Sequence, residues 1–150
     1  VIMCWGEDGH GRLAVPYGDE LDIFWEGVAC GDRHCCGMLT ANSVRAKNFR
    51  AEDNVVCWGS NAIGQLDVPG VIAGRTGPAE RFVRIEAGHS HTCGLTAGSK
   101  IWCWGYTRPF RLVADIPDKN FTSLSAGGRH SCAIDVDRLA YCWGFDQQGQ

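Results

Sequence analysis

Apolar and polar residues alternate along several short stretches of this chain. In Phe82–Ala87 the sequence FVRIEA places apolar side chains at nearly every second position, and Phe121–Ala126 repeats this stretch. A period of two is typical of a β-strand with one buried face, because successive side chains of a strand point to opposite sides. No segment shows the period of an amphipathic helix. The pattern therefore predicts an all-β chain.

Two further strands are predicted after each of these stretches. Gly88 ends the first strand, residues 91–95 are expected to form a second strand, 97–99 a turn and 100–104 a third strand. The later copy has its turn at 135–137 and its third strand at 139–143. A loop containing Gly and Pro follows, as in residues 60–70. The sequence predicts a repeat of three or four short strands.

Two sequence motifs mark the repeats. The tripeptide Cys-Trp-Gly begins at Cys4, Cys57, Cys103 and Cys142. A second motif, Gly-x-x-His-x-Cys followed by Gly or Ala, precedes the last three copies at residues 31–37, 88–94 and 127–133. The last two copies of both motifs are 39 residues apart, whereas the earlier spacing is longer. Such self-similarity is the signature of stacked structural repeats with insertions in their loops.

The expected hairpins bring cysteines together in pairs. If Gly98 centres its turn, Cys93 and Cys103 lie opposite each other on antiparallel strands. Opposed residues have Cα atoms about 4.5–5.5 Å apart, which a disulfide can bridge. The same register gives the set of pairs Cys36–Cys57, Cys93–Cys103 and Cys132–Cys142. The insertion at 40–54 then lies at the tip of the first hairpin.

Three cysteines fall outside these pairs. Cys4 has the position of a third-strand cysteine, so we expect its partner upstream of this sequence. Cys30 and Cys35 replace residues that are Ala and Thr or Ser in the other repeats. They either pair with each other or stay as thiols. Nine cysteines in 150 residues favour an oxidising compartment.

Charge argues against a nucleic-acid-binding protein, and hydropathy argues against a membrane-spanning segment. The net charge is −3 and comes from well-mixed residues, without a basic run that could follow a phosphate backbone, so we expect no nucleic-acid partner. No apolar stretch approaches the ~20 residues that cross a bilayer, so we expect no membrane span in this segment. The first residues also lack the basic and apolar regions of a signal peptide.

The motifs resemble a known repeat family. Residues 56–66, VCWGSNAIGQL, together with the Ala-Gly-x-x-His segments, are similar to the regulator of chromosome condensation repeat. Its pattern continues as Trp-Gly-x-Asn-x-x-Gly-Gln-Leu-Gly, and this chain departs from it at 106–110 and at Asp67. The cysteine before each Trp-Gly resembles the cysteine-bearing subgroup that includes plant Crinkly-type receptor ectodomains.

The resemblance implies a β-propeller of four-stranded blades, usually seven. Three full repeats and a leading partial one are too few to close a propeller of about 4–8 blades, so we expect part of a longer protein. The expected blades span about 1–22, 23–81, 82–120 and 121–150 of one propeller domain.

Histidine and tryptophan in the motifs have alternative interpretations. Zinc prefers His and Cys ligands, but each motif histidine adjoins a cysteine that already has a cross-strand partner, which favours a hydrogen bond between strands. The histidines are His34, His91 and His130. The recurring tryptophans predict packing between blades rather than ligand stacking; they are Trp5, Trp58, Trp104 and Trp143. Trp25 and Trp102 lie outside the motif and are candidates for a contact surface, with local packing as the favoured alternative.

We expect no enzymatic activity, no cofactor and no metal. Nucleophilic catalysis by a cysteine needs a free thiolate, and only Cys30 and Cys35 remain outside the expected pairs and the leading remnant. No acid or oxyanion feature accompanies them. The triplet at Asn120 matches the N-glycosylation pattern, so Asn120 is a candidate glycan site.

The function that we expect is a disulfide-stabilised module for protein–protein interaction or structural support, in an extracellular or lumenal assembly or a receptor ectodomain. One alternative is a secreted inhibitor of a hydrolase. Another is a guanine-nucleotide exchange factor for a small GTPase, which cystines disfavour because the nucleus keeps thiols reduced. A protein partner is expected at the variable loops 40–54 and 67–81. We expect the charged insertion 40–54 to be mobile or ordered by a neighbouring chain.

Overall fold

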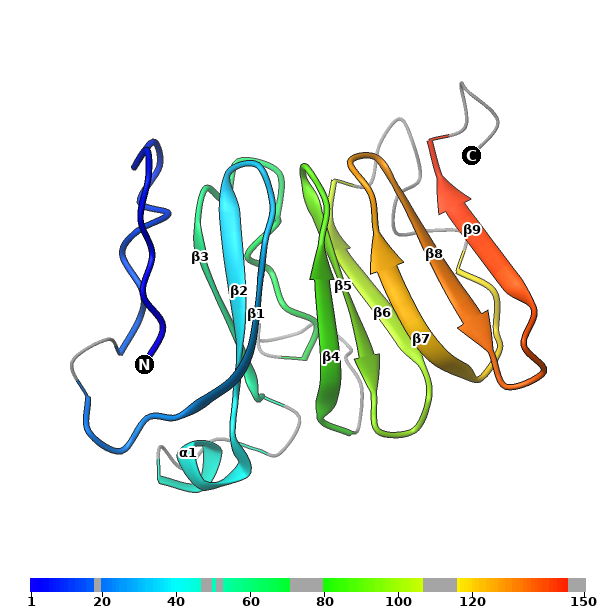
Figure 1. Ribbon diagram of the computed structural model, residues 1–150, viewed down its shortest axis with the longest axis horizontal. Helices are drawn as coiled ribbons and strands as arrows, with labels where there is room; N and C mark the ends of the chain where they lie inside the picture. The colour runs from blue at the N-terminus through cyan, green and yellow to red at the C-terminus, as the bar shows by residue number, and fades with distance from the viewer. Residues whose placement is uncertain (18–19, 47–49, 51–52, 71–79, 107–115, 146–150) are drawn as a thin grey trace.

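Three small antiparallel sheets lie side by side in chain order (Figure 1). The computed structural model describes residues 1–17, 20–46, 50, 53–70, 80–106 and 116–145. We call the sheet β1-β2-β3 blade A, β4-β5-β6 blade B and β7-β8-β9 blade C. In the described residues before Trp25, the chain forms no strand and passes along the outer side of blade A (Figure 1); we call this part the leading segment.

Within the described residues, each blade has three strands of five or six residues. The bounds are β1 Trp25–Cys30, β2 His34–Leu39, β3 Val55–Gly59, β4 Phe82–Ala87, β5 His91–Thr96, β6 Ile101–Gly105, β7 Phe121–Ala126, β8 His130–Asp135 and β9 Ala140–Gly144. The first strands of blades B and C begin and end where the alternation predicts, and the other strands of these blades agree to within one residue. The fold prediction of all-β propeller blades is confirmed.

The first strand of each blade departs from strict alternation. In β4 the buried residues are Phe82 and Ile85, three positions apart, whereas Val83 is 48% exposed. The pairing with β5 shifts register between Phe82 and Arg84. A β-bulge adds one residue to a strand, so that residues an odd number apart can face the same side. β7 shows the same shift, and it buries Phe121 and Leu124.

The hydrophobic core lies between blades. One cluster lies between blades A and B, where β2, β3 and the loop after β3 pack against the face of blade B that points toward blade A. Its members are Cys36, Met38, Val55, Val68, Phe82, Ile85 and Trp104. An equivalent cluster joins blades B and C and includes Leu95, Ile101, Phe121, Leu124 and Trp143. Trp104 and Trp143 therefore pack between blades, as expected. Each blade depends on its neighbour for the burial of its apolar face.

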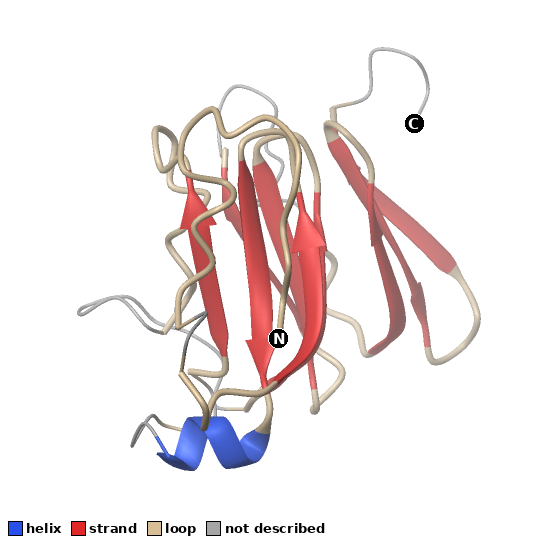
Figure 2. Ribbon diagram, turned by 60° about the vertical axis from the view of Figure 1, so that its left-hand side comes forward, coloured by secondary structure: helices blue, strands red, loops and turns tan. Residues whose placement is uncertain are grey.

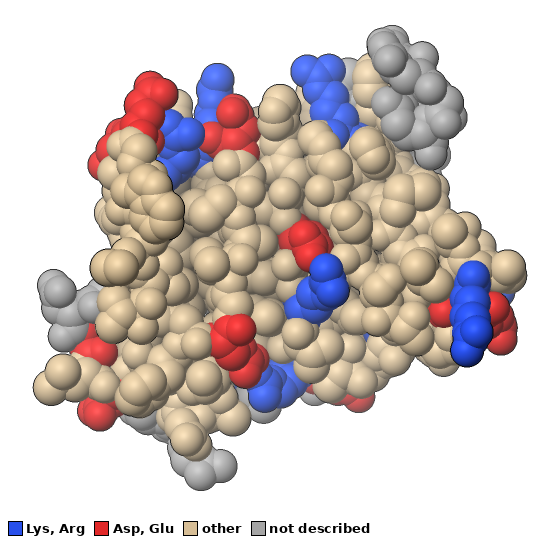
Figure 3. All heavy atoms as spheres, viewed as in Figure 1, with Lys and Arg blue, Asp and Glu red and all other residues tan. Residues whose placement is uncertain are grey.

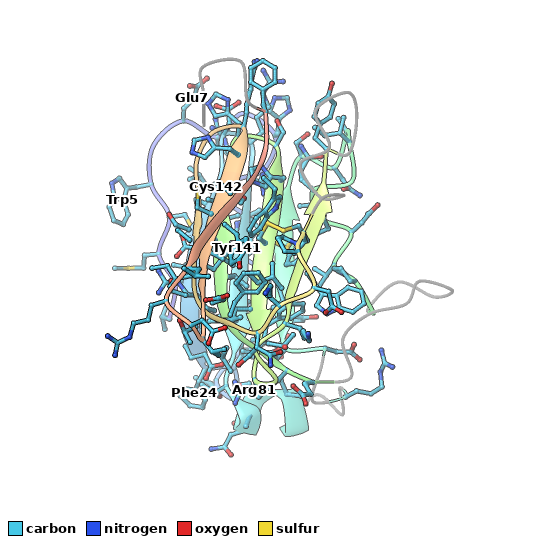
Figure 4. The ribbon with its side chains drawn as sticks, turned by 90° about the vertical axis from the view of Figure 1, so that its right-hand side faces the viewer. Trp5, Glu7, Phe24, Arg81, Tyr141 and Cys142 are labelled. Atoms are coloured by element: carbon cyan, nitrogen blue, oxygen red, sulfur yellow. A yellow bond between two sulfur atoms is a disulfide. The ribbon has the colours of Figure 1, made fainter. Side chains whose placement is uncertain are left out.

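Trp5 does not follow the other motif tryptophans. Its side chain is 85% exposed, and Figure 4 shows it pointing away from the ribbon. The prediction of packing between blades is therefore wrong for Trp5. The reason is structural: Trp5 lies in the leading segment, which forms no strand to orient it against a sheet.

The insertion in blade A contains a short helix, α1 (Ala41–Ala46), which lies across the end of the sheet (Figure 2). Its Val44 is buried with Ile23 and Leu39, and the Thr40 hydroxyl caps it by accepting a hydrogen bond from the Ser43 amide at 3.4 Å. The prediction that 40–54 is mobile or ordered by another chain is therefore wrong for Ser43, Val44 and Asn54, which are all buried. Residues 47–49 and 51–52 lie outside the described residues.

The helix does not change the register of blade A. Cys36 still faces Cys57, because α1 lies beyond the ends of β2 and β3 and leaves their pairing intact. The expectation that no segment is helical is wrong here, since six residues are too few to show a helical period. Within the described residues, no helix has the length and apolar character needed to cross a membrane.

Candidate functional site

The three Gly-x-x-His loops stack at one end of the blades. In each loop the glycine amide donates to the carbonyl of its histidine, with N–O distances of 2.8 Å for Gly31, 2.9 Å for Gly88 and 2.9 Å for Gly127. Successive loops are also joined: the Asp32 amide donates to the His89 carbonyl at 3.3 Å, and the His89 amide donates to the Gly128 carbonyl at 2.9 Å. The motif therefore forms a continuous hydrogen-bonded stack across the blades.

Glycine is required in these loops because two groups approach its Cα. A Cβ at Gly88 would collide with the ring of His91 and with the backbone carbonyl of Gly127 in blade C. A Cβ at Gly31 would meet the His34 ring and the Gly88 carbonyl. The carbonyl belongs to the backbone of the next blade and cannot rotate away. The motif glycine thus sets how closely two blades stack.

The motif histidines connect each blade to the next one. His34 Nε2 lies 2.7 Å from the Thr92 hydroxyl, and His91 Nε2 lies 2.8 Å from the Ser131 hydroxyl. Both rings are fully buried. Thr92 and Ser131 directly precede the motif cysteines of their blades. The hydrogen bond between strands that the sequence favours therefore joins different blades, and we call these bonds the histidine–hydroxyl ladder.

Each hydroxyl of the ladder also lies near a disulfide sulfur of the preceding blade. The Thr92 hydroxyl also lies 3.7 Å from Cys36 Sγ, and the Ser131 hydroxyl lies 3.5 Å from Cys93 Sγ. A disulfide sulfur carries no hydrogen, so the hydroxyl is the donor in that contact. Its oxygen can then accept from the histidine Nε2–H. A neutral imidazole with its proton on Nε2 fits this arrangement, and it leaves no hydrogen on the unpartnered Nδ1.

The electrostatics of the ladder agree with neutral rings. Burial lowers the pKa of His34 from 6.5 to about 4, although the nearby Asp32 carboxylate opposes this shift. Burial also lowers the pKa of His91 to about 4, and the charges of His34 and His130 add to the effect. A protonated ring would carry a second N–H donor on Nδ1, which is buried without a hydrogen-bond partner in both histidines.

Four disulfides hold the described hairpins together. They join Cys36–Cys57, Cys93–Cys103, Cys132–Cys142 and Cys30–Cys35. The first three pairs lie at equivalent positions of the second and third strands in successive blades. The fourth joins β1 to β2 across the Gly-x-x-His loop of blade A. Cys4 is the free cysteine among the described residues.

The remaining candidates from the sequence are a metal site, two tryptophans outside the motif and the glycan site. No group of three or more His, Cys, Asp or Glu could hold a metal ion within the described ranges. Trp25 packs edge-on against Trp58 with ring centroids 6.0 Å apart, and Trp102 packs against the cluster between blades A and B. Local packing thus accounts for both tryptophans. Asn120 is exposed and directly precedes β7.

Sequence reasoning did not identify two kinds of residue at the contacts between blades. Thr92 and Ser131 carry the ladder, and the signal was the hydroxyl residue before the motif cysteine in two of the three repeats. Asn54 is buried, donates from Nδ2 to the Phe82 carbonyl at 2.9 Å, and accepts from the Phe82 amide at 2.9 Å. No sequence pattern marks Asn54, because its partner begins the next blade.

The end of blade A that carries α1 also exposes apolar side chains. Leu21 is 92% exposed and Phe24 is 56% exposed, and Figure 4 shows Phe24 at the same end of the molecule as α1. The backbone of Phe24 is nevertheless fixed: its amide donates to the Ser43 hydroxyl at 2.6 Å, and its carbonyl accepts from the Thr40 amide at 3.0 Å. An exposed aromatic ring on a fixed backbone suits a protein contact.

Charges do not mark a single binding surface on the face seen in Figure 3. Acidic and basic side chains are interspersed there, with uncharged surface between them. Ion pairs of the molecule include Arg81 with Glu26, which joins the residue before β4 to β1, and Arg84 with Glu86 at 2.7 Å. The end of blade A that carries α1, where the exposed Phe24 has a fixed backbone, is the candidate contact surface.

Comparison with known proteins agrees with this architecture. Residues 82–107 and 121–150 match the family model of the regulator of chromosome condensation (RCC1) repeat. The ectodomain of the Physcomitrella patens receptor kinase CR4 superposes with a TM-score of 0.71 at 26% identity, over 95% of this chain and 35% of that one. Two further structures are similar in fold.

The CRINKLY WD40 ectodomain of the Arabidopsis thaliana receptor kinase ACR4 gives a TM-score of 0.67 at 24% identity, over 95% of this chain and 43% of that one. Yeast RCC1 (Prp20), solved bound to Kap60, gives 0.65 at 20% identity, over 94% of this chain and 39% of that one. The chain thus spans well under half the length of these structures. Two of its blades match the model of the regulator of chromosome condensation repeat, and the chain folds as part of a β-propeller.

Proposed function

We propose that this chain is part of a disulfide-stabilised propeller that binds a protein partner in an extracellular or lumenal space, as a receptor ectodomain or a subunit of a surface assembly. The observation that carries the proposal is the cystine at the same hairpin position in all three blades. Such bonds persist in oxidising compartments. The likeness to receptor kinase ectodomains supports the same location.

We place the partner at the α1 end of blade A. Phe24 projects its ring while its backbone is held by Ser43 and Thr40, so little conformational entropy is lost when the ring is buried by a partner. Leu21, three residues before Phe24, is also exposed. Rigid aromatic side chains of this kind often supply a large share of the binding free energy at protein interfaces. The structure describes only parts of the variable loops 40–54 and 67–81, where the sequence also predicts a protein contact.

A binding experiment tests the location of this surface. The chain is immobilised and incubated with surface and extracellular proteins of its source organism, and the retained proteins are quantified by mass spectrometry. We expect Phe24→Ser to reduce specific retention at least tenfold. Leu139→Ser is the matched control, because Leu139 is 55% exposed at a hairpin tip of blade C. Equal retention by wild type and Phe24→Ser would contradict the proposed surface.

A second experiment tests the compartment. Urea unfolding is measured for the oxidised chain and for the chain held in a glutathione buffer at cytosolic potential. We expect the reduced chain to lose several kcal/mol of unfolding free energy, because each hairpin bond contributes about 2–3 kcal/mol. A reduced chain as stable as the oxidised one would remove the reason to place the protein in an oxidising space.

A further inference from the structure

We propose that the Cys30–Cys35 disulfide is a site of reversible thiol–disulfide exchange, and that a low-molecular-weight thiol enters it by attack on Cys30. The other described disulfides join the second and third strands of their blades, whereas this one joins β1 to β2. It also differs from them in its role in the fold, in its access to solvent and in the charge placed beside it.

The loop that this bond spans folds without it in the other blades. Blade C has Ala126 and Ser131 at the register positions of Cys30 and Cys35. The loop glycine nevertheless donates to the histidine carbonyl at 2.9 Å in blade C and in blade B, against 2.8 Å in blade A. The loop therefore keeps its geometry without the bond, and opening of the bond does not require opening of the hairpin.

One cysteine of the pair can be reached from outside. Cys30 is exposed, whereas Cys35 is only 5% exposed. Cys30 borders a cavity of about 350 Å³ between the leading segment and blade A, and it also borders the hollow between the Gly-x-x-His loops. Cys36 and Cys93 of the hairpin disulfides are fully buried. Because a thiolate must reach the sulfur that it attacks, Cys30 is the point of entry.

Arg12 supplies a positive charge beside the sulfur that leaves. Its Nη1 donates to the Asp32 carbonyl at 2.7 Å, within the loop between the two cysteines. Its own carbonyl accepts from Trp58 Nε1 at 2.9 Å, and Trp58 is the cross-strand partner of Cys35. Arg12 Nε is buried without a hydrogen-bond partner among the described residues. A nearby cation stabilises a thiolate, so this guanidinium favours the departure of Cys35.

The cavity suits a small thiol that carries charges of both signs. Its volume of about 350 Å³ lies at the lower end of the range of small-molecule sites, which is about 300–1,000 Å³. Its apolar lining includes Met3, Leu13 and Val28, and its charged side chains are Glu7 and Arg12. Glutathione has an ammonium group and two carboxylates, which can pair with both of these charges. It is therefore the probe for the site.

The exchange takes two steps. The thiolate of the small thiol attacks Cys30 Sγ, a new S–S bond forms, and the Cys30–Cys35 bond breaks with its electron pair on Cys35 Sγ. A second thiolate then attacks the outer sulfur of this mixed disulfide, so that a symmetrical disulfide leaves and Cys30 becomes a thiolate. Two electrons pass to the protein, and two thiols are oxidised. The reverse sequence restores the Cys30–Cys35 bond.

The test measures the opening of each disulfide in the wild-type chain. Samples in reduced and oxidised glutathione are quenched with acid, alkylated and mapped by mass spectrometry. We expect Cys30–Cys35 to open about tenfold faster than Cys36–Cys57, with glutathione found on Cys30. Cys4 is a thiol that lines the same cavity, and Cys4→Ser should leave both results unchanged. Equal rates for the two disulfides, or glutathione on Cys4 alone, would overturn the proposal.

The role of the guanidinium has its own readout. Arg12→Gln introduces the residue that follows Trp58 at the same distance, Gln65, and should slow the opening of Cys30–Cys35 by about threefold or more. Arg12→Lys keeps the charge and should keep the rate. Cys132–Cys142 is the matched control, because Cys142 is also exposed, and its rate should not change in either variant. Equal slowing of both disulfides would contradict a local effect of the charge.

A double variant tests whether the bond is dispensable for the fold. Cys30→Ala with Cys35→Ser reproduces the pair Ala126 and Ser131 of blade C. We expect this variant to keep the circular dichroism spectrum of the wild type and slow exchange of the Gly31 amide, and to take up no glutathione in this loop. Cys35→Ser alone should hold a stable glutathione adduct on Cys30. Loss of the native spectrum in the double variant would show that the bond is structural and that the proposal is wrong.

Discussion

Removal of the Thr92 hydroxyl is a direct test of the histidine–hydroxyl ladder. Thr92→Val keeps the shape of the side chain and replaces only the oxygen that lies 2.7 Å from His34 Nε2. Thr92 and His34 are both fully buried, so water cannot replace the lost partner. The variant therefore leaves His34 Nε2 without its hydrogen-bond partner at the contact between blades A and B.

The expected loss of unfolding free energy is about 1–3 kcal/mol, the cost of a buried polar group that loses its hydrogen bond. The gain from burying the extra methyl group of valine offsets less than about 1 kcal/mol of this. Because His34 lies in blade A, the contact between the blades should loosen before either hairpin opens. Hydrogen exchange should rise first at the Asp32 amide, whose bond to the His89 carbonyl joins the loops of blades A and B.

Urea unfolding followed by far-ultraviolet circular dichroism measures the change in stability. Thr122→Val is the matched control, because the Thr122 hydroxyl is exposed and donates to the Ile134 carbonyl within its own blade at 3.2 Å. We expect less than about 0.5 kcal/mol for this control. A double-mutant cycle with His34→Leu should give a coupling of about 1–2 kcal/mol. Additive losses, or equal stability of Thr92→Val and wild type, would refute the ladder.

Four further predictions concern the same architecture. The pKa values of His34 and His91 are lowered from 6.5 to about 4, so below pH 6.5 the unfolded chain binds protons that the folded chain does not. The free energy of unfolding should therefore fall between pH 6.5 and 4, by up to about 3 kcal/mol per histidine, and then level off. A flat pH profile in urea titrations would contradict neutral buried rings. Gly88→Ala should cost about 1–3 kcal/mol because its Cβ meets the backbone of blade C, whereas Gly128→Ala, with open space around it, should cost under 1 kcal/mol in the same assay. Non-reducing peptide mapping should recover the hairpin cystines of blades B and C within single repeats, and a bridge between different repeats would show a wrong register. Expression through a eukaryotic secretory pathway should add a glycan that peptide N-glycosidase removes and that Asn120→Gln lacks; an unmodified Asn120 peptide would reject the glycan site.

The sequence alone determined the features that depend on short-range contacts. Cys93 and Cys103 are ten residues apart on one hairpin, so the turn at Gly98 was enough to place them opposite each other. The strand order within a blade followed from alternation and turn residues in the same way. Repetition of the motifs then extended the result from one blade to the others.

Only the tertiary structure decided how blades meet. The partners in the ladder are 58 residues apart for His34 and 40 residues apart for His91, and no local pattern links such positions. The bulge in β4 places Phe82 and Ile85 against the same neighbouring blade, and the six-residue helix is stabilised because Val44 packs against Ile23 and Leu39. These features arise where one sheet stacks on the next. The residues involved are far apart in the sequence, and they meet only after the blades have folded.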